Sequence, residues 1–393
     1  MLHSCKYLIV GGGMAADAAA HGIREVDQTG TITMLSAEQH RPYDRPPLSK
    51  KLWAGKPLDS IWRKIDDAGV DLRLRTRAVA CDPAARTLTD ESGNTYEYEK
   101  LLLATGGTPR RLPFADDGVI YYRDLNDYQR VRALADKNAS FVIIGGGFIG
   151  SEIAAALVSN DCKVSMLFPA ASIGSHIYPE ALSEFLNKYF REKGVTVLPG
   201  ESAVATVKSG DKMVVRTGAD QAIECDAVIA GIGIEPDVSL AKSIGLATDN
   251  GITVDEYLRT THPDIYAAGD VANFHSPALG IRRRVEHEDN ANTMGVIAGR
   301  NMAGRAERYD HVPYFYSDLF DLGYEAVGVL DSSMDIVENW VTPYRKGVLY
   351  YLKDKRVRGV LLWNTWDQVE AARQLVSMDK APDRETLKGF IPS

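Results

Sequence analysis

The sequence contains little cysteine: its 393 residues include only four, Cys5, Cys81, Cys162 and Cys225, and these lie far apart. No CxxC pair is present, so neither a redox dithiol nor a cysteine-based zinc site is expected. The eight histidines form no HExxH motif. We therefore predict that the protein holds no metal ion.

Long apolar runs are absent as well. No stretch of about 18 uncharged apolar residues occurs, so no transmembrane helix is expected. A strand-like run begins at residue 7, with no charged leader and apolar core before it. A secretory signal is therefore not expected, and we predict a cytoplasmic protein.

The chain also lacks an excess of positive charge. Its 53 acidic and 45 basic residues give a formal net charge of −8. A general nucleic-acid binder needs the opposite balance, so no nucleic-acid partner is expected. One local basic run, residues 282–284, is either a docking point for an acidic partner or a solvated loop.

The sequence does contain one glycine-rich unit twice. Residues 7–16 and 141–150 each comprise an apolar run followed by three glycines, and a helix-forming stretch follows both copies. A second strand-like run comes next, at 31–35 and at 163–168. This strand, turn, helix and strand order is the context that a dinucleotide-binding βαβ unit requires, and it predicts an α/β fold.

The small residues of such a unit have separate tasks. The first glycine permits a tight turn, the second lets the backbone approach a pyrophosphate, and the third small residue lets the helix pack on the strand. The pyrophosphate then binds at the helix N-terminus. Two copies in the same context favour two bound dinucleotides, and electron transfer between them, over glycine-rich turns without a ligand. The residues concerned are Gly11, Gly13 and Ala16 in the first copy, and Gly145, Gly146, Gly147 and Gly150 in the second.

Further segments point to the same chemistry. Residues 101–107 form an apolar run that ends in a small-residue turn, and residues 260–270 end in Gly269-Asp270. Glu38 is the candidate for the ribose of the first nucleotide, because an acid is expected about 20 residues beyond the glycines. Glu152 lies in the first turn of the second helix, where the helix dipole favours a carboxylate.

These segments together resemble the two-dinucleotide flavoprotein reductases of the glutathione-reductase structural class. Within that class, the sequence resembles the ferredoxin and rubredoxin reductases of oxygenase systems, and still more closely the apoptosis-inducing-factor family. The segments that carry the resemblance are residues 45–50, 104–107, 145–152, 268–270, 283–287, 322–328 and 362–364.

The resemblance implies two Rossmann-like dinucleotide-binding domains and a C-terminal α+β domain. The implied domains are a discontinuous FAD domain (1–115 and 245–315), an inserted NAD(H) domain (116–244) and a C-terminal domain (316–393). Strands are expected in the last domain at 347–352 and 357–363, and a helix near 367–376.

Lys50 and Glu152 are the predicted catalytic residues. The resemblance implies that they form an ion pair beside flavin N5, which favours the reduced flavin and helps to position the nicotinamide. The alternative is that Glu152 only caps its helix and that Lys50 is exposed to solvent. Phe148 and His287 match the aromatic pair that encloses the nicotinamide in the apoptosis-inducing-factor family, whereas Tyr316 replaces a tryptophan of that family.

The remaining positions are implied cofactor contacts. The expected FAD contacts are Gly11, Gly13, Ala16, Glu38, Arg45, Lys50, Thr105, Gly106, Arg123, Gly269, Asp270, His287 and Tyr316. The expected NAD contacts are Gly145, Gly146, Gly147, Phe148, Ile149, Gly150, Gly233, Glu286, Glu325 and Asn364. An acid after the second strand of the NAD unit would bind a ribose hydroxyl and an arginine would bind a 2′-phosphate, but residues 168–171 contain neither. NADH is preferred here because that loop has no arginine, and NADPH is not excluded.

The stretch 41–50 contains no cysteine, which argues against disulfide reduction and against cysteine-sulfenate oxidases. Electrons must therefore leave the flavin for an external acceptor. The preferred function is an NAD(P)H-dependent FAD oxidoreductase that serves a ferredoxin- or rubredoxin-type carrier, with Arg41, Lys51 and residues 282–284 as candidate contacts to an acidic partner. One alternative is an enzyme like apoptosis-inducing factor, with slow flavin reduction, a long-lived charge-transfer complex and a redox-sensing role. A third is an assembly role in which NADH acts as a conformational ligand. A homodimer is considered as well.

Overall fold

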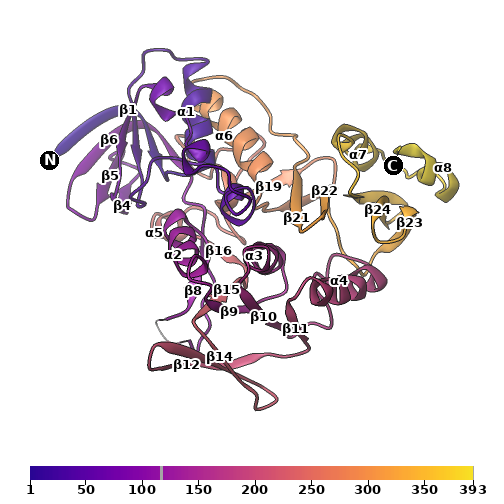
Figure 1. Ribbon diagram of the computed structural model, residues 1–393. Coiled ribbons are helices and arrows are strands. Elements are labelled where there is room, and N and C mark those ends of the chain that lie inside the picture. Colours follow the sequence, from indigo (N-terminus) through magenta and orange to yellow (C-terminus); the bar gives the residue numbers. More distant parts are fainter. Residues whose placement is uncertain (116–117, 393) are drawn as a thin grey trace. The chain divides into compact units, whose positions relative to one another are not determined.

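The computed structural model describes residues 1–115 and 118–392, and in it the chain forms two compact units (Figure 1). Unit 1 consists of Met1–Arg45, Leu58–Thr108 and Glu235–Pro313, and unit 2 of Pro46–Pro57, Pro109–Ile234 and Tyr314–Ser393. Unit 2 thus contains the predicted C-terminal domain, the predicted NAD domain up to Ile234, and the short segment that carries Lys50, whereas residues 235–244 of the predicted NAD domain belong to unit 1. The predicted domain boundary at 116 and the last residue lie outside the described residues, and the three-domain division stays a prediction.

Unit 1 is built on a seven-stranded sheet in the order β3-β2-β1-β6-β5-β4, with β18 paired to β6. Strands β3, β2, β1, β6 and β18 run parallel, so the segments that follow them meet at one edge of the sheet. Ligands of open α/β sheets bind at this carboxyl edge. The strands are β1 (Leu2–Val10), β2 (Ile32–Leu35), β3 (Val70–Arg73), β4 (Ala78–Asp82), β5 (Thr87–Asp90), β6 (Thr95–Leu103) and β18 (Ile265–Ala267).

The central strand β6 shows how sequence pattern and pairing agree. In its first half, buried Tyr96 and Tyr98 alternate with more exposed residues, and this half pairs antiparallel with β5. In its second half, Leu101–Leu103 are all buried, and this half lies between β1 and β18 in parallel register. Continuous apolar burial is typical of parallel strands that are covered on both faces.

Helices α1 (Met14–Arg24) and α6 (Glu288–Met302) pack against each other in unit 1 (Figure 1). Their contact is lined by small residues that let the backbones approach closely. A Cβ atom on Gly22 would lie 2.2 Å from the Val296 carbonyl oxygen, and a Cβ atom on Gly299 would lie 2.0 Å from the Ala19 carbonyl oxygen. The alanine-rich sequence of α1 therefore serves this helix contact as well as helix formation.

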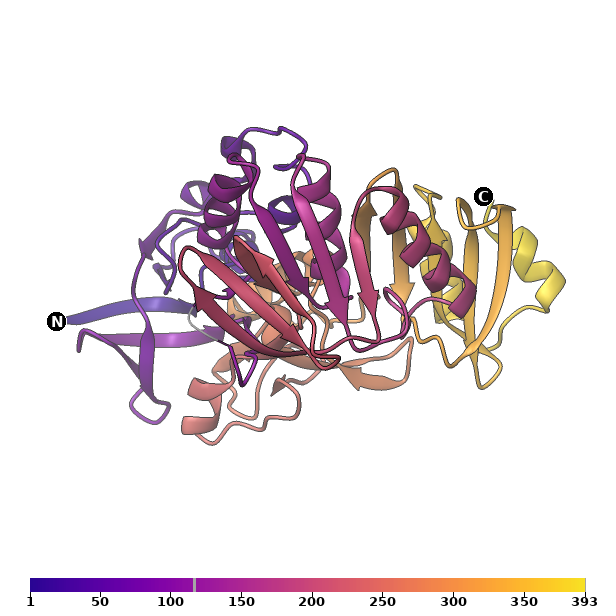
Figure 2. The same ribbon diagram turned by 60° about the horizontal axis from the view of Figure 1, so that its bottom comes forward.

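Unit 2 contains the second copy of the repeated unit. Its parallel sheet has the order β11-β10-β9-β15-β8, and the parallel strands run side by side in Figure 2. An antiparallel sheet, β12-β13-β14, is formed by the chain between β11 and β15. The elements are β8 (Ile120–Tyr121), α2 (Leu125–Ala135), β9 (Ser140–Ile144), α3 (Phe148–Val158), β10 (Lys163–Phe168), α4 (Glu180–Glu192), β11 (Thr196–Pro199), β12 (Ala203–Ser209), β13 (Lys212–Thr217), β14 (Ala222–Cys225) and β15 (Ala227–Ala230).

The C-terminal part of unit 2 is an antiparallel sheet in the order β21-β22-β25-β24-β23, followed by two helices. The expected strands at 347–352 and 357–363 are observed as β24 and β25, and the expected helix is observed as α7, two residues after its predicted start. The elements are β21 (Tyr314–Leu319), β22 (Leu322–Gly328), β23 (Asp335–Thr342), β24 (Lys346–Lys353), β25 (Arg356–Trp363), α7 (Val369–Ser377) and α8 (Arg384–Phe390).

Aromatic side chains hold these two parts of unit 2 together. Tyr178, which follows β10, makes edge contacts with Tyr324 of β22 and Trp363 of β25, at centroid separations of 5.8 and 5.7 Å. Tyr189 of α4 makes an edge contact with Phe320, and Arg345 stacks over Tyr189. Each aromatic pair contributes roughly 0.5–1.5 kcal/mol of stabilisation beyond that of the area it buries. These aromatic contacts therefore help to hold the two parts together as one unit.

The short elements complete the description. No helix in residues 1–115 and 118–392 combines the length and apolar character needed to cross a bilayer. The four cysteines are free thiols. The remaining elements are η1 (Pro46–Ser49), η2 (Leu58–Ile61), η3 (Ile65–Ala68), β7 (Gly107–Pro109), β16 (Ile234–Pro236), α5 (Ser239–Ser243), β17 (Ile252–Thr253), η4 (Gly269–Val271), β19 (Ala272–Ser276) and β20 (Ile281–Arg283).

The helix contact in unit 1 yields a first prediction. Gly22→Ala and Gly299→Ala are each expected to destabilise the protein by about 1–3 kcal/mol, because the new methyl group would displace a backbone carbonyl of the facing helix. Gly389→Ala in α8 is the matched control: nothing lies within 4 Å of its Cβ position. The control is expected to be neutral or to gain up to about 1 kcal/mol of helix propensity. Urea unfolding measures all three, and equal stability of the Gly299 and Gly389 variants would contradict this account.

Candidate nucleotide sites and a buried ion pair

The first glycine loop connects β1 to α1. Gly11 has a φ of +128°, and a Cβ atom there would lie 2.1 Å from the Ala104 carbonyl oxygen, so only glycine fits. Gly13 differs, because nothing lies within 4 Å of its Cβ position. It is the N-cap residue of α1 and provides no side-chain cap. The loop thus exposes the N-terminus of α1 beside open space, as a pyrophosphate site requires.

The second glycine loop, between β9 and α3, has the same construction. Gly145 has a φ of +123°, and its Cβ would lie 2.4 Å from the Gly231 carbonyl oxygen. Gly147 has open space around its Cβ position and caps α3 without a side chain. A Cβ on Gly150 would lie 2.1 Å from the Gly145 carbonyl oxygen, so this small residue allows close packing of the helix on the loop. Both loops therefore fit a dinucleotide pyrophosphate.

At the carboxyl edge of the unit 1 sheet, Glu38 and Arg45 form an ion pair. The Tyr43 hydroxyl donates to Glu38 Oε2 at 2.7 Å and accepts from Arg45 Nη1 at 3.2 Å. Burial lowers the pKa of Arg45, but the interactions with Tyr43, Glu38 and Asp270 outweigh that effect, and the net shift is upward. The structure thus groups two predicted FAD contacts with Tyr43, which sequence reasoning did not identify.

Other predicted FAD contacts follow β6 and β18 at the same edge. The Thr105 hydroxyl donates to the Asp237 carbonyl oxygen at 2.7 Å, and Gly106 has a φ of +65°. Gly269 has a φ of +78°, and its Cβ would lie 2.8 Å from the Cβ of Ala15 in α1. The Asp270 carbonyl oxygen accepts from Arg284 Nη1 at 3.0 Å. The segment after β18 is therefore fixed close to the start of α1.

The basic run at 282–284 contributes largely to the structure of unit 1. Arg284 forms an ion pair with Glu286 at 2.6 Å as well as bonding to Asp270. Arg282 Nη1 donates to the carbonyl oxygens of Val254 and Asn273 at 3.0 and 2.7 Å. The predicted NAD contact Glu286 thus already has a cationic partner within its own unit.

In unit 2 the predicted catalytic residues are in contact. Lys50 Nζ lies 2.7 Å from Glu152 Oε2, and the side chains are only 8% and 3% exposed. Lys50 Nζ also lies 5.1 Å from the centre of the Tyr316 ring. Removing a single partner from a buried ion pair costs about 3–5 kcal/mol, because the remaining charge is left uncompensated. The alternative in which Lys50 is solvent-exposed does not agree with this burial.

The backbone in front of Lys50 is also anchored. The Leu48 carbonyl oxygen accepts from the Trp53 indole at 2.8 Å and from the Tyr122 hydroxyl at 2.5 Å. Burial raises the pKa of Tyr122 well above its usual value, so this hydroxyl remains a donor. These bonds fix the 3₁₀ helix η1, and with it the point from which the Lys50 side chain begins.

Residues expected to contact NAD also lie in unit 2. The Phe148 ring meets the Phe315 ring edge-on at 5.6 Å. Within the described residues, Glu325 Oε2 is buried and has no hydrogen-bond partner. Burial and then the charge of Asp367 raise the pKa of Glu325. An unpartnered buried carboxylate oxygen fits a contact with a ligand donor.

Two other predicted NAD positions have local structural roles. Asn364 Oδ1 accepts from the Gly323 backbone at 2.8 Å, and its Nδ2 donates to the Arg345 carbonyl oxygen at 2.9 Å. Gly233 has a φ of +90°, and its carbonyl oxygen accepts from the Arg110 backbone. The expected sandwich of Phe148 and His287 draws on both units and stays a prediction, as do the contacts of Arg123 and Ile149.

The loop after β10 is neutral close to the strand. The Ala170 carbonyl oxygen accepts from the Gly200 backbone, and Asn187 of α4 donates to the Ala171 carbonyl oxygen and accepts from the Ile173 backbone. The loop is therefore held by backbone bonds and one amide side chain. No charged side chain occurs between Phe168 and Ser175.

Ser49 and Ser317 are functional candidates that sequence reasoning missed. Both serine hydroxyls donate to the Glu152 carboxylate, at 2.5 and 2.6 Å respectively. The only sequence signal was position: Ser49 directly precedes Lys50, and Ser317 directly follows Tyr316.

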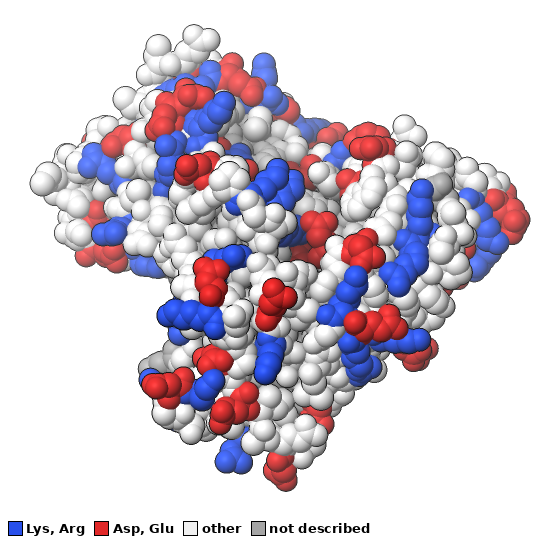
Figure 3. All heavy atoms as spheres, viewed as in Figure 1, with Lys and Arg blue, Asp and Glu red and all other residues white. Residues whose placement is uncertain are grey.

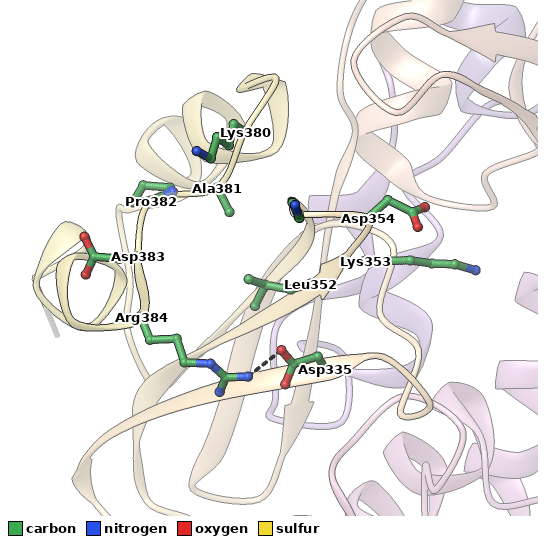
Figure 4. Close-up of a pocket in the computed structure, with 10 residues that line it drawn as sticks. Asp335, Leu352, Lys353, Asp354, Lys380, Ala381, Pro382, Asp383 and Arg384 are labelled. Atoms are coloured by element: carbon green, nitrogen blue, oxygen red, sulfur yellow. Dashed lines mark hydrogen bonds and ion pairs between the residues drawn. The ribbon is translucent and has the colours of Figure 1, made fainter.

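A crevice of about 740 Å³ between β23, the end of β24, the β24–β25 turn and the segment from Lys380 to the first residue of α8 contains none of the predicted site residues (Figure 4). Arg384 spans to Asp335 in an ion pair at 2.5 Å, while the Lys353 and Asp354 side chains point away. Its charged groups do not converge on a common point, so it lacks the character of a ligand site. Among the described residues, no group of three or more His, Cys, Asp or Glu side chains could hold a metal ion.

Comparisons with known proteins agree with these features. The family model for pyridine nucleotide-disulphide oxidoreductases matches residues 5–295. The model for the C-terminal part of mitochondrion-associated apoptosis-inducing factor matches residues 298–343 and 337–378. Together the two models cover nearly the whole chain.

Relatives and solved structures extend over similar lengths. Apoptosis-inducing factor 1 of Dictyostelium discoideum is 33% identical over 94% of this chain and 78% of its own length. The ferredoxin–NAD(+) reductase component of the anthranilate 1,2-dioxygenase system of Burkholderia cepacia is 32% identical over 97% and 96%. A chain of the covalent putidaredoxin reductase–putidaredoxin complex superposes with a TM-score of 0.91 at 30% identity, covering 98% of this chain and 95% of that one. The protein therefore belongs to the pyridine nucleotide-disulphide oxidoreductase family and is an FAD-dependent oxidoreductase.

Proposed function

We propose that the protein oxidises NADH with FAD as its bound redox group and passes the electrons to an external carrier of the ferredoxin or rubredoxin kind. The observation that supports this most strongly is the buried Lys50–Glu152 pair, in a chain with two glycine loops of matching geometry and no cysteine between Cys5 and Cys81. FAD, when bound, supplies the chemistry that links a two-electron hydride donor to a one-electron acceptor. The proposal includes a cytoplasmic location.

The residues of this chain have separate tasks in that function. The loops at Gly11–Gly13 and Gly145–Gly147 present two helix N-termini, each of which favours a pyrophosphate. Lys50 contributes a cation whose position is fixed by Glu152 and by the Tyr316 ring. Glu325 offers a buried carboxylate oxygen to a donor group of the nicotinamide nucleotide.

The carrier partner is supported by similarity rather than by a basic surface. Arg41 and Arg284, predicted as contacts to an acidic partner, form ion pairs with Asp66 and Glu286. On the face shown in Figure 3, Lys and Arg are interspersed with Asp and Glu rather than gathered in one field. The relative from Burkholderia cepacia is named a ferredoxin reductase component, and the superposed chain comes from a complex with putidaredoxin.

A second candidate is a slow NADH oxidoreductase with a sensing or assembly role, like apoptosis-inducing factor. The specific observation in its favour is the match of residues 298–378 to the C-terminal model of that family. The two candidates differ in the rate at which NADH reduces the flavin and in the lifetime of the state that follows.

Anaerobic stopped-flow reduction of the FAD-loaded protein by NADH and NADPH tests both. Fast bleaching, a transient long-wavelength band and turnover with a ferredoxin or rubredoxin would support the carrier reductase. Slow bleaching with a persistent band, and a change of mass in solution on adding NADH, would favour the second candidate. The same mass measurement without NADH tests for a homodimer. A protein that takes up no FAD would overturn both.

The ion pair generates a prediction on flavin reduction. Lys50→Met with Glu152→Gln removes both charges together, so no buried charge is left without a partner. We expect NADH to reduce the flavin of this double variant about 10²-fold more slowly, because the positioned cation is lost. Lys56→Met, in the same segment but exposed, is the control and is expected to keep the wild-type rate. A double variant with wild-type reduction kinetics would remove the pair from the mechanism.

The neutral loop after β10 generates a prediction on nucleotide preference. Ala170→Glu is expected to raise the preference for NADH, because a carboxylate binds ribose hydroxyls and repels a 2′-phosphate. Ala170→Arg is expected to shift the ratio of kcat/KM for NADPH over NADH upward by about tenfold or more. Ala219→Arg, in the turn after β13, adds the same charge elsewhere in unit 2 and controls for net charge. Unchanged ratios in both Ala170 variants would show that this loop does not contact the nucleotide.

A further inference from the structure

The Glu152 carboxylate receives three hydrogen-bond donors from two segments outside its own helix. Oε2 accepts from Lys50 Nζ at 2.7 Å and from the Ser49 hydroxyl at 2.5 Å. Oε1 accepts from the Ser317 hydroxyl at 2.6 Å. Ser49, Ser317 and Glu152 are all buried. Both carboxylate oxygens are therefore satisfied without water.

Both serines are adjacent in sequence to residues that fix the lysine charge: one is next to Lys50 itself, and the other is next to Tyr316, whose ring contacts Lys50. Ser49 ends η1 immediately before Lys50, and Ser317 follows Tyr316 in β21. The lysine ammonium contacts both Glu152 and the Tyr316 ring. Glu152 thus ties together, through its two oxygens, the two segments that determine where the lysine charge is held.

We propose that Ser49 and Ser317 are positioning residues that clamp the Glu152 carboxylate, and through it fix the Lys50 ammonium for flavin reduction. This inference rests on the proposed function for its kinetic consequence. Lys50 alone can satisfy only part of a carboxylate that has about four acceptor sites. Without Ser317, Oε1 would be left buried and unsatisfied, which costs more than the bond itself contributes. The carboxylate would then turn to find another donor and would carry Lys50 with it.

The contact itself is tested in the protein without reference to catalysis. Ser317→Ala, Glu152→Met and the double variant are compared by urea unfolding, because methionine has a similar length but lacks the oxygens that accept from the serine. The changes in the free energy of unfolding are expected to be non-additive, because the serine and the glutamate act through one hydrogen bond. Additive changes would overturn the clamp. Ser183→Ala is the control: the hydroxyl of this buried serine of α4 has no hydrogen-bond partner within the described residues, and its loss is expected to add independently to that of Glu152.

The positioning role is tested on the FAD-loaded protein. Ser317→Ala and Ser49→Ala are each expected to slow flavin reduction by NADH about tenfold, equivalent to about 1.4 kcal/mol in the barrier. The midpoint potential of the flavin is expected to become more negative, because a cation near the flavin favours its reduced form. The Kd for NADH is expected to stay unchanged. Ser317→Thr keeps the hydroxyl and is expected to retain both the rate and the potential of the wild type. If the extra methyl group does not fit in β21, Ser49→Thr is the conservative variant to use instead, with the same expected result.

The effect of Ser317→Ala in a protein that already lacks the Glu152 carboxylate distinguishes a positioning role from general support of the fold. When Ser317→Ala is added to Glu152→Met, the reduction rate is expected to change less than twofold and the potential not measurably. Equal losses from Ser317→Ala in the wild-type and the Glu152→Met backgrounds, or a wild-type potential in Ser317→Ala, would overturn the positioning role. Wild-type protein whose flavin is not reduced by NADH would overturn the proposed function instead, and the unfolding cycle would still decide whether the clamp exists.

Discussion

The structure of unit 2 depends on one buried carboxylate. Glu152 is the fifth residue of α3, so it lies just beyond the first helical turn where the sequence predicted it, and the second glycine loop precedes the same helix. Its oxygens bind Lys50, Ser49 and Ser317, which come from two other segments of the chain. Transfer of a charged pair out of water costs several kcal/mol per ion, so such a pair is retained only with close geometry and additional donors. The hydroxyl groups supply those donors.

The two glycine loops show how a repeated sequence gives a repeated geometry with different surroundings. In both loops the first glycine backs onto a carbonyl oxygen and the third faces open space. The middle glycines differ, because a Cβ on Gly12 would meet the Ser36 hydroxyl whereas one on Gly146 would meet the Phe168 ring. The repeat therefore preserves the part that approaches a nucleotide, while the contact to the neighbouring strand is adapted separately in each unit.

Much of the fold could be predicted from local patterns. The strand, glycine turn and helix order is set within about ten residues, and the apolar spacing of α7 identified that helix almost to its start. Hydrogen bonds between distant segments could not be read in this way. Ser49 and Ser317 lie 103 and 165 residues from Glu152, and a serine carries no pattern that reveals such a partner. The same limit applies to Arg284, whose charge suggested an exposed docking point but is engaged by Glu286 and by the Asp270 carbonyl.

The segment Pro46–Pro57 belongs to unit 2 although the chain on both sides of it belongs to unit 1. This placement has a consequence for how such enzymes can be recombined. A chimera that exchanged residues 109–234 and 314–393 between two relatives would inherit Glu152 and Ser317 from one parent and Ser49 and Lys50 from the other. Lys50 and Glu152 would then come from different parent proteins. Any difference between the parents in the backbone path of η1 would displace the Lys50 ammonium from the Glu152 carboxylate. Shuffling within this family therefore has three segments to move together, the shortest of which carries Lys50.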